Sequence, residues 1–139
     1  MSESATLSLG RLSNEKMASS LHIREHSFKV DVNAAAGGED LGPDPHDLYD
    51  AALGACKSLT MMWLARRKGY DVRDIAVRVS RDASLERQGS YTLTVHVEVK
   101  GNLNAEAMAA LAAAAEKCPI QKLMTQATTV VNTEVRLLG

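Results

Sequence analysis

One long apolar stretch, residues 45–68, constrains what this chain can fold into more than any other feature. Asp44 is a natural N-cap for a helix, and Pro45 suits the first helical position. Gly69 is a typical residue at which such a helix ends. Apolar side chains occupy nearly every side of the stretch between residues 48 and 64. A helix that is apolar on most sides is buried on most sides, so we expect the rest of the fold to surround it.

Alternating apolar residues predict strands on both sides of this helix. Residues 75–79 and 91–99 alternate apolar and polar side chains, and Arg87-Gln88-Gly89 between them predicts the turn of an antiparallel hairpin. Residues 5–12 predict a first strand. Within residues 21–32 the apolar positions change from odd to even numbers, which indicates either two strands joined by a tight turn or a bulge.

The C-terminal part of the chain predicts two helices and a last strand. Asn104 is an N-cap for an alanine-rich helix over residues 105–117, and Pro119 ends that helix and opens a short one through Gln126. The last strand is predicted from Val131, Val135 and Leu137. The resulting order, β-β-β-α-β-β-α-β, predicts an α+β fold.

The composition indicates a small core that a second subunit would extend. The chain has 139 residues, enough for a single domain over residues 1–139, and 45% of them are apolar. Only 4% are aromatic, so alanine, valine, leucine and methionine must build most of the core. Such a thin core favours burial against a partner subunit.

Charge and hydropathy argue against several classes of partner. The formal net charge is -1, from 16 basic and 17 acidic side chains, which does not fit a nucleic-acid-binding face. Asp50 and Lys57 interrupt the apolar stretch, so we do not expect it to span a membrane. Residues 1–4 show no signal-peptide pattern. We therefore expect a cytoplasmic protein, in which paired thiols are more often transient or catalytic than structural.

The two cysteines, Cys56 and Cys118, are the candidate reactive groups. Cys56 lies inside the apolar helix and shares a face with other apolar residues, where packing in the core is the more frequent role of a cysteine. Pro119 predicts that Cys118 is the N-cap of the following helix, where backbone N–H groups favour the thiolate. A residue that merely ends the alanine-rich helix would give the same pattern. No CxxC spacing indicates a metal site.

The residues around both cysteines resemble those of a known family. Residues 42–48 and 51–56 are similar to the central helix of the OsmC/Ohr family, the osmotically inducible and organic hydroperoxide resistance proteins. Arg67-Lys68-Gly69-Tyr70 at the helix end and Cys118-Pro119-Ile120 fit the same pattern. The similarity covers most of the chain from Phe28 onward.

This resemblance implies a fold, an assembly and a reaction. The fold would be α+β, with antiparallel sheets around the long central helix, in an intertwined homodimer. The reaction would be the reduction of organic hydroperoxides by a thiol peroxidase that needs no metal or organic cofactor. Cys56 would attack the peroxide, Cys118 would form a disulfide with the oxidised sulfur, and a dithiol reductant would restore both thiols. The helix start by itself favours Cys118 as the attacking thiol, so the resemblance reverses that assignment.

A buried Cys56 would need a nearby cation to ionise. In well-known branches of the family, an arginine from the N-terminal strands provides it, held by a glutamate at the start of the central helix. His46 stands at the glutamate position, followed by Asp47, and the candidate arginines are Arg24 and Arg11. His46 lies about 15 Å before Cys56 along the helix axis, so it could act only through a bridging residue or a partner chain. These differences indicate a general OsmC-like protein more than a dedicated hydroperoxidase.

The expected substrate and the alternatives depend on what surrounds Cys56. Apolar walls suited to an alkyl peroxide would come from Leu59, Met61, Met62 and Trp63. One alternative is an OsmC-like small-molecule-binding or stress-response protein with little peroxidase turnover. Another is a scaffold in which both cysteines are structural. The distance between the two sulfurs separates the peroxidase from these alternatives.

Overall fold

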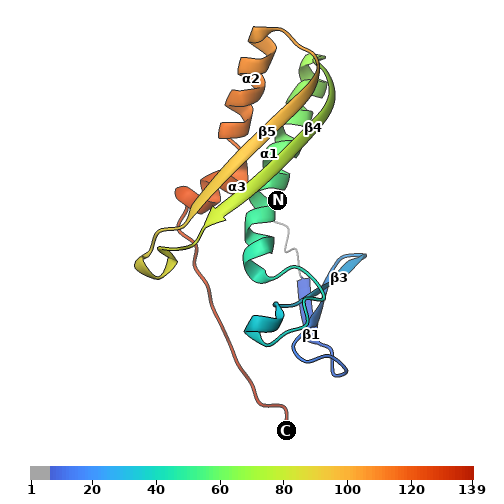
Figure 1. Ribbon diagram of the computed structural model, residues 1–139, viewed down its shortest axis with the longest axis vertical. Coiled ribbons are helices and arrows are strands. Elements are labelled where there is room, and N and C mark those ends of the chain that lie inside the picture. The colour runs from blue at the N-terminus through green and yellow to red at the C-terminus, as the bar shows by residue number, and fades with distance from the viewer. Residues whose placement is uncertain (1–6) are drawn as a thin grey trace. The chain divides into compact units, whose positions relative to one another are not determined.

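The computed structural model describes residues 7–139 and has the predicted α+β architecture. The chain forms two compact units, one up to Ala51 and the other from Ala52 onward. The long helix α1, Pro45–Lys68, is continuous and contributes its first turns to one unit and the rest to the other (Figure 1). No helix among the described residues is long and apolar enough to cross a membrane.

The first unit contains an antiparallel sheet of three strands in the order β1-β2-β3. Its strands are β1 (Leu7–Arg11), β2 (Ser19–Ile23) and β3 (His26–Val30). Leu21 pairs with Leu9 on one side and with Phe28 on the other. The two-residue turn between β2 and β3 holds Arg24 at a positive φ of 52°. The change from odd to even apolar positions therefore reflects a tight turn, and the bulge considered as the alternative is wrong.

A buried carboxylate organises the loop between β3 and α1. Asp31 accepts hydrogen bonds from the backbone N–H groups of Val32 at 2.8 Å, Glu39 at 3.0 Å and Leu41 at 3.2 Å. The short 3-10 helix η1, Ala34–Ala36, lies within this loop. Burial by itself raises the pKa of Asp31, but these three donors and the charge of Lys29 outweigh it and hold the pKa below its ordinary value of 3.8.

Both ends of α1 follow local rules that the sequence predicts. Asp44 accepts from the backbone N–H of Asp47 at 2.8 Å, and the Asp47 carboxylate accepts from the backbone N–H of Asp44 at 3.0 Å, which is a reciprocal capping box. At the other end Gly69 has a positive φ of 71°. The Tyr70 N–H then donates to the carbonyl of Ala65 at 2.9 Å, which closes the helix. The predicted bounds of the long helix are thus confirmed.

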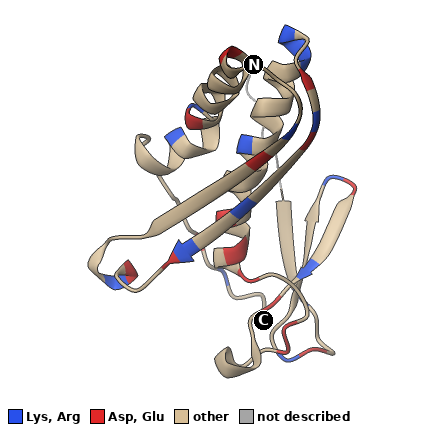
Figure 2. Ribbon diagram, turned by 45° about the horizontal axis from the view of Figure 1, so that its top comes forward, with Lys and Arg blue, Asp and Glu red and all other residues tan. Residues whose placement is uncertain are grey.

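The second unit combines an antiparallel hairpin with helices. Its elements after α1 are β4 (Asp71–Asp82), the 3-10 turn η2 (Glu86–Gln88), β5 (Thr92–Asn102), α2 (Ala105–Glu116) and α3 (Pro119–Thr125). Apolar residues of the hairpin are half-buried and alternate with exposed polar residues, as the sequence predicts. The hairpin runs along α1 and α2 (Figure 1). Charges of both signs are interspersed along its two strands (Figure 2).

The core of this unit lies between the hairpin, α1 and α2. Met61, Ala65 and Leu111 are its buried members, with relative exposures of 0–3%. The partly buried residues around them are Leu64, Tyr70, Val72, Ile75, Val97, Val99, Leu103 and Ala115. Gly54 allows α1 to approach the hairpin closely, because a Cβ there would lie 2.9 Å from Cγ2 of Val79.

The predicted last strand is absent, since residues 127–139 form neither helix nor strand in this chain. A strand requires a neighbouring edge for its N–H and C=O groups, and the described β4 and β5 pair only with each other. The large apolar side chains of this segment have relative exposures of 77–93%: Val130, Val131, Val135, Leu137 and Leu138. Alternation in the sequence identifies a strand-forming segment but does not supply its partner.

Candidate functional site

Cys56 lies in the middle of α1 and is half-buried. Its sulfur lies 3.9 Å from the hydroxyl oxygen of Thr60, one helical turn later. Of the residues that share its side of the helix, Leu53 is buried, whereas Leu59 and Trp63 have relative exposures of 69% and 59%. The apolar face that Cys56 shares is therefore packed only in part in the single chain. Cys56 lies at the border between the packed and the exposed sides of α1.

Cys118 is fully buried, with a relative exposure of 0%. It is the N-cap of α3, and Pro119 takes the first helical position, so the predicted placement is confirmed. Its sulfur makes no capping hydrogen bond to the N–H groups of α3. Both cysteines are free thiols, and both belong to the unit that begins at Ala52.

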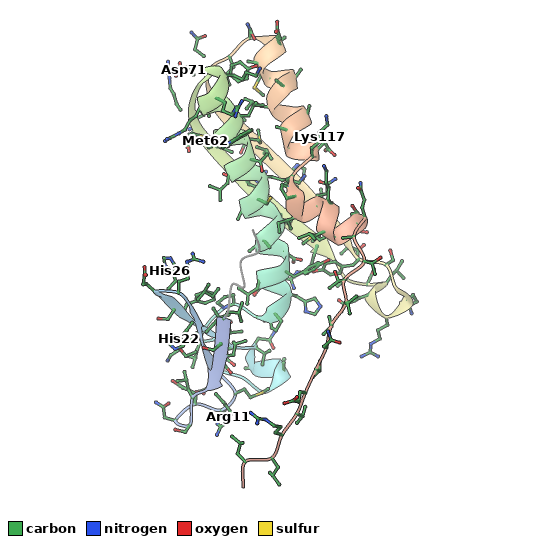
Figure 3. All side chains as sticks on the ribbon, turned by 180° about the vertical axis from the view of Figure 1, so that it is seen from behind. Arg11, His22, His26, Met62, Asp71 and Lys117 are labelled. Atoms are coloured by element: carbon green, nitrogen blue, oxygen red, sulfur yellow. The ribbon has the colours of Figure 1, made fainter. Side chains whose placement is uncertain are left out.

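A buried lysine connects the helix of Cys56 with the corner that carries Cys118. Lys57 has a relative exposure of 6%. Its Nζ donates to the carbonyl oxygen of Ala115 at 2.7 Å and to Oε1 of Gln121 at 2.5 Å. The corner between α2 and α3 can be followed in Figure 3, where Lys117, the residue before Cys118, is labelled. In the sequence, Lys57 is only an interruption of an apolar stretch.

A signal for Lys57 does exist in the sequence. Lysines are almost never fully buried unless polar groups receive their ammonium. A lysine within a helix that is apolar on most sides therefore requires a buried acceptor. The pattern does not say which acceptors these are, because Ala115 and Gln121 are 58 and 64 residues away in the chain.

The candidate activating residues lie in the unit that ends at Ala51. His46 is exposed in the first turn of α1, and the half-buried Asp47 carboxylate takes part in the capping box. Arg24 is exposed at the turn between β2 and β3. Arg11, at the end of β1, is exposed and donates to the carbonyl of Leu12 at 3.4 Å. A role in activating Cys56 stays a prediction for each of them.

Only some of the apolar residues expected to surround a substrate at Cys56 are free to do so. Met61 belongs to the buried core, so it serves packing rather than a substrate site. Met62 is half-buried, and Leu59 and Trp63 are exposed. The guanidinium of Arg67 lies over the Trp63 ring at 4.9 Å from its centre, a distance at which a cation is attracted to the face of the ring.

The described residues offer thiol chemistry rather than a ready metal centre. No group of three or more His, Cys, Asp or Glu side chains within residues 7–139 is arranged to hold a metal ion. What the second unit does present is a half-buried thiol with a hydroxyl neighbour and a second, buried thiol at a helix corner. Such thiols can undergo oxidation and disulfide exchange when they ionise and meet.

The family model described as OsmC-like protein matches residues 37–134, well over half of the chain, so the chain belongs to this family. A putative osmotic stress induced and detoxification response protein from Psychrobacter arcticus has a similar structure. Its TM-score is 0.70 at 15% identity, over 88% of this chain and 89% of that one. No curated protein matches the chain.

Two further similar structures carry names that concern hydroperoxides. An organic hydroperoxide resistance protein OsmC from Legionella pneumophila gives a TM-score of 0.63 at 20% identity, over 89% of this chain and 90% of that one. The organic hydroperoxide resistance protein OhrB of Bacillus subtilis gives a TM-score of 0.57 at 23% identity, over 89% of this chain and 92% of that one. At these identities the similarities establish the fold, and the expected OsmC-like α+β fold is confirmed.

Proposed function

We propose that this protein reduces organic hydroperoxides through a cycle in which Cys56 and Cys118 alternate between two thiols and a disulfide. The observation that carries the proposal is that both free thiols lie in one compact unit. Hydrogen bonds from Lys57 also join α1, which contains Cys56, to the corner between α2 and α3, which contains Cys118. Membership of the OsmC-like family and the names of two similar structures support it.

In the first step, the half-buried Cys56 is the attacking group. Its thiolate attacks the terminal oxygen of the hydroperoxide, so that an S–O bond forms and the O–O bond breaks. The sulfur is oxidised to a sulfenic acid, and the peroxide is reduced to an alcohol that takes up a proton. The hydroxyl of Thr60 can donate to the thiolate before the attack, because it lies 3.9 Å from the sulfur. His46, Asp47 and Arg24 are the proposed further aids to ionisation.

In the second step, Cys118 resolves the sulfenic acid. Its sulfur attacks the Cys56 sulfur, an S–S bond forms, and the oxygen leaves as water with the proton of the Cys118 thiol. A dithiol reductant then supplies two electrons and two protons, and both cysteines return to thiols. Because Cys118 is fully buried, thiols in solution have little access to its sulfur.

The proposal includes a homodimer in the cytoplasm. Leu59 and Trp63 on α1 and the apolar residues of the segment 127–139 are exposed in the single chain. Large exposed apolar surfaces are typical of interaction sites. An intertwined dimer would pack α1 near its counterpart and give the segment a strand edge to pair with.

The complete burial of Cys118 favours a second candidate, an OsmC-like small-molecule-binding or stress-response protein with little turnover. A buried thiol is most often inert packing. A thiol titration separates the two functions. Protein is treated with one equivalent of tert-butyl hydroperoxide, the peroxide is removed, and free thiols are counted in denaturant.

The peroxidase proposal predicts that the count falls from two thiols per chain to none and returns to two after dithiothreitol. A count that stays at two would favour the binding protein. A count of one, with an oxygen adduct on Cys56 alone, would support the first step and contradict the role of Cys118.

A further inference from the structure

We infer that Lys57 is a positioning residue that holds the corner carrying Cys118 against α1 and thereby sets the rate at which the Cys56–Cys118 disulfide closes. This inference rests on the proposed two-cysteine function. It concerns the resolving step alone, because the bonds of Lys57 go to the segment of Cys118.

The hydrogen bonds of Lys57 join the two segments whose sulfurs must meet. Lys57 follows Cys56 directly in α1. Its two acceptors, Ala115 and Gln121, lie three residues before and three residues after Cys118. One ammonium therefore holds both sides of the corner. Both acceptors lie within the length of one lysine side chain from the backbone of Lys57, the residue next to Cys56.

The physical strength of this connection comes from burial and from the helix end that it meets. The carbonyl of Ala115 belongs to the last turn of α2, where helix carbonyls lack partners within the helix and carry partial negative charge. The last turn of α2 contains no basic residue of its own. Lys57, which belongs to a different helix, places a cation at this end in addition to the C-cap residue Lys117. Hydrogen bonds to a charged group are stronger than those between neutral groups.

Removing the ammonium would leave the corner held less firmly. The Ala115 carbonyl and the Gln121 amide would lose their shared donor in a partly buried place, which favours a local shift that exposes them further to water. The corner carries Cys118, whose sulfur has no capping hydrogen bond to restrain it. Because a misplacement of about 1 Å can slow a reaction on the order of a hundredfold, the closing step is sensitive to such a shift.

The experiment compares Lys57→Met with Lys57→Arg and with the control Lys122→Met, an exposed lysine of α3. Disulfide closure is first driven by diamide, a general thiol oxidant that accepts the two electrons without any peroxide. It is then driven by substoichiometric tert-butyl hydroperoxide. Rapid alkylation followed by mass spectrometry gives the rate of Cys56 oxidation and the rate of Cys56–Cys118 closure separately.

We expect Lys57→Met to slow closure on the order of tenfold to a hundredfold in both arms. Oxidation of Cys56 by the hydroperoxide should stay within about twofold of the wild type, as expected for a residue that acts on the other cysteine. Lys57→Arg should recover most of the closing rate, and Lys122→Met should match the wild type. If Lys57→Met does not fold, Gln121→Leu removes only one acceptor and should slow the same step to a smaller extent.

Closure at the wild-type rate in Lys57→Met, or an equal loss in both steps, would overturn the inference. Absence of a Cys56–Cys118 disulfide in diamide-treated wild type would overturn it as well. Closure with diamide but no reaction with hydroperoxide would contradict the peroxidase function and leave the role of Lys57 measurable in the diamide arm.

Discussion

At the scale of single residues, the side chains next to Cys56 affect how readily its sulfur reacts. The sulfur is half-buried and has the Thr60 hydroxyl at 3.9 Å. A thiolate can only accept hydrogen bonds, so in the ionised state the hydroxyl must be the donor. A hydrogen bond donated to the charged sulfur stabilises it, so we expect the Thr60 hydroxyl to assist the reaction of Cys56.

Thr60→Val removes this hydroxyl and keeps the shape of the side chain. A hydrogen bond of this kind contributes roughly 0.5–1.5 kcal/mol, so alkylation of Cys56 by iodoacetamide at neutral pH should slow about two- to tenfold. The matched control is Ser58→Ala, which removes a hydroxyl two residues after Cys56 on the same helix. This variant should leave the rate of alkylation unchanged. A pH profile of alkylation identical in wild type and Thr60→Val would contradict this role.

Asp31 gives a prediction for the dependence of stability on pH. Its pKa in the folded protein lies below the ordinary value of 3.8, so its carboxylate stabilises the fold at neutral pH. This stabilisation is complete above the unfolded pKa and is lost as the pH falls through the folded pKa. Asp31→Asn should therefore lower the urea midpoint at pH 7, with a difference from wild type that shrinks below about pH 4. A difference that grows in acid would contradict the assignment.

Local rules explain which site features the sequence predicts. The N-cap position of Cys118 and the cap at Asp44 depend on neighbours within three residues, so residue type and spacing suffice. The bonds of Lys57 join residues that are 58 and 64 positions apart, and no local rule reports them. The half-buried state of Cys56 is also a tertiary property, and apolar spacing alone does not show which residues of a helix face are covered.

At the scale of elements, the helices and paired strands were predictable because each carries its own periodicity and end signals. The segment 127–139 was not, because strand formation requires a partner edge that a sequence pattern cannot provide. The close contact between α1 and the hairpin could not be predicted from the sequence either. It depends on Gly54, whose missing side chain leaves room for Val79.

Gly54→Ala tests this close approach. The new Cβ would lie 2.9 Å from Cγ2 of Val79, and such overpacking costs about 1–3 kcal/mol, against about 1 kcal/mol gained in helix propensity. We expect a lower free energy of unfolding from urea titration. In the Val79→Ala background the clash is removed, and Gly54→Ala should then stabilise by up to about 1 kcal/mol. The same stabilisation in both backgrounds would contradict the packing described.

At the scale of the whole molecule, the chain leaves large apolar side chains without cover. Leu59 and Trp63 on α1, and Val135 and Leu137 near the C-terminus, have relative exposures of 59–93%. Light scattering should therefore report a stable dimer at low micromolar concentration. Deleting residues 128–139 should weaken the dimer, because the proposed strand would be lost. A folded, stable monomer of the full chain at that concentration would contradict the proposed assembly.

The most direct test of the central claim, that Cys56 attacks and Cys118 resolves, is mass spectrometry of two variants after treatment with an alkyl hydroperoxide. Cys118→Ser should acquire oxygen on Cys56, first as the sulfenic acid and with excess peroxide as higher oxides, since no thiol resolves it. Cys56→Ser should leave Cys118 unmodified, because that thiol is fully buried. Oxygen on Cys118 in Cys56→Ser, together with an unmodified Cys56 in Cys118→Ser, would reverse the assignment. No adduct on either variant would contradict the peroxidase function itself.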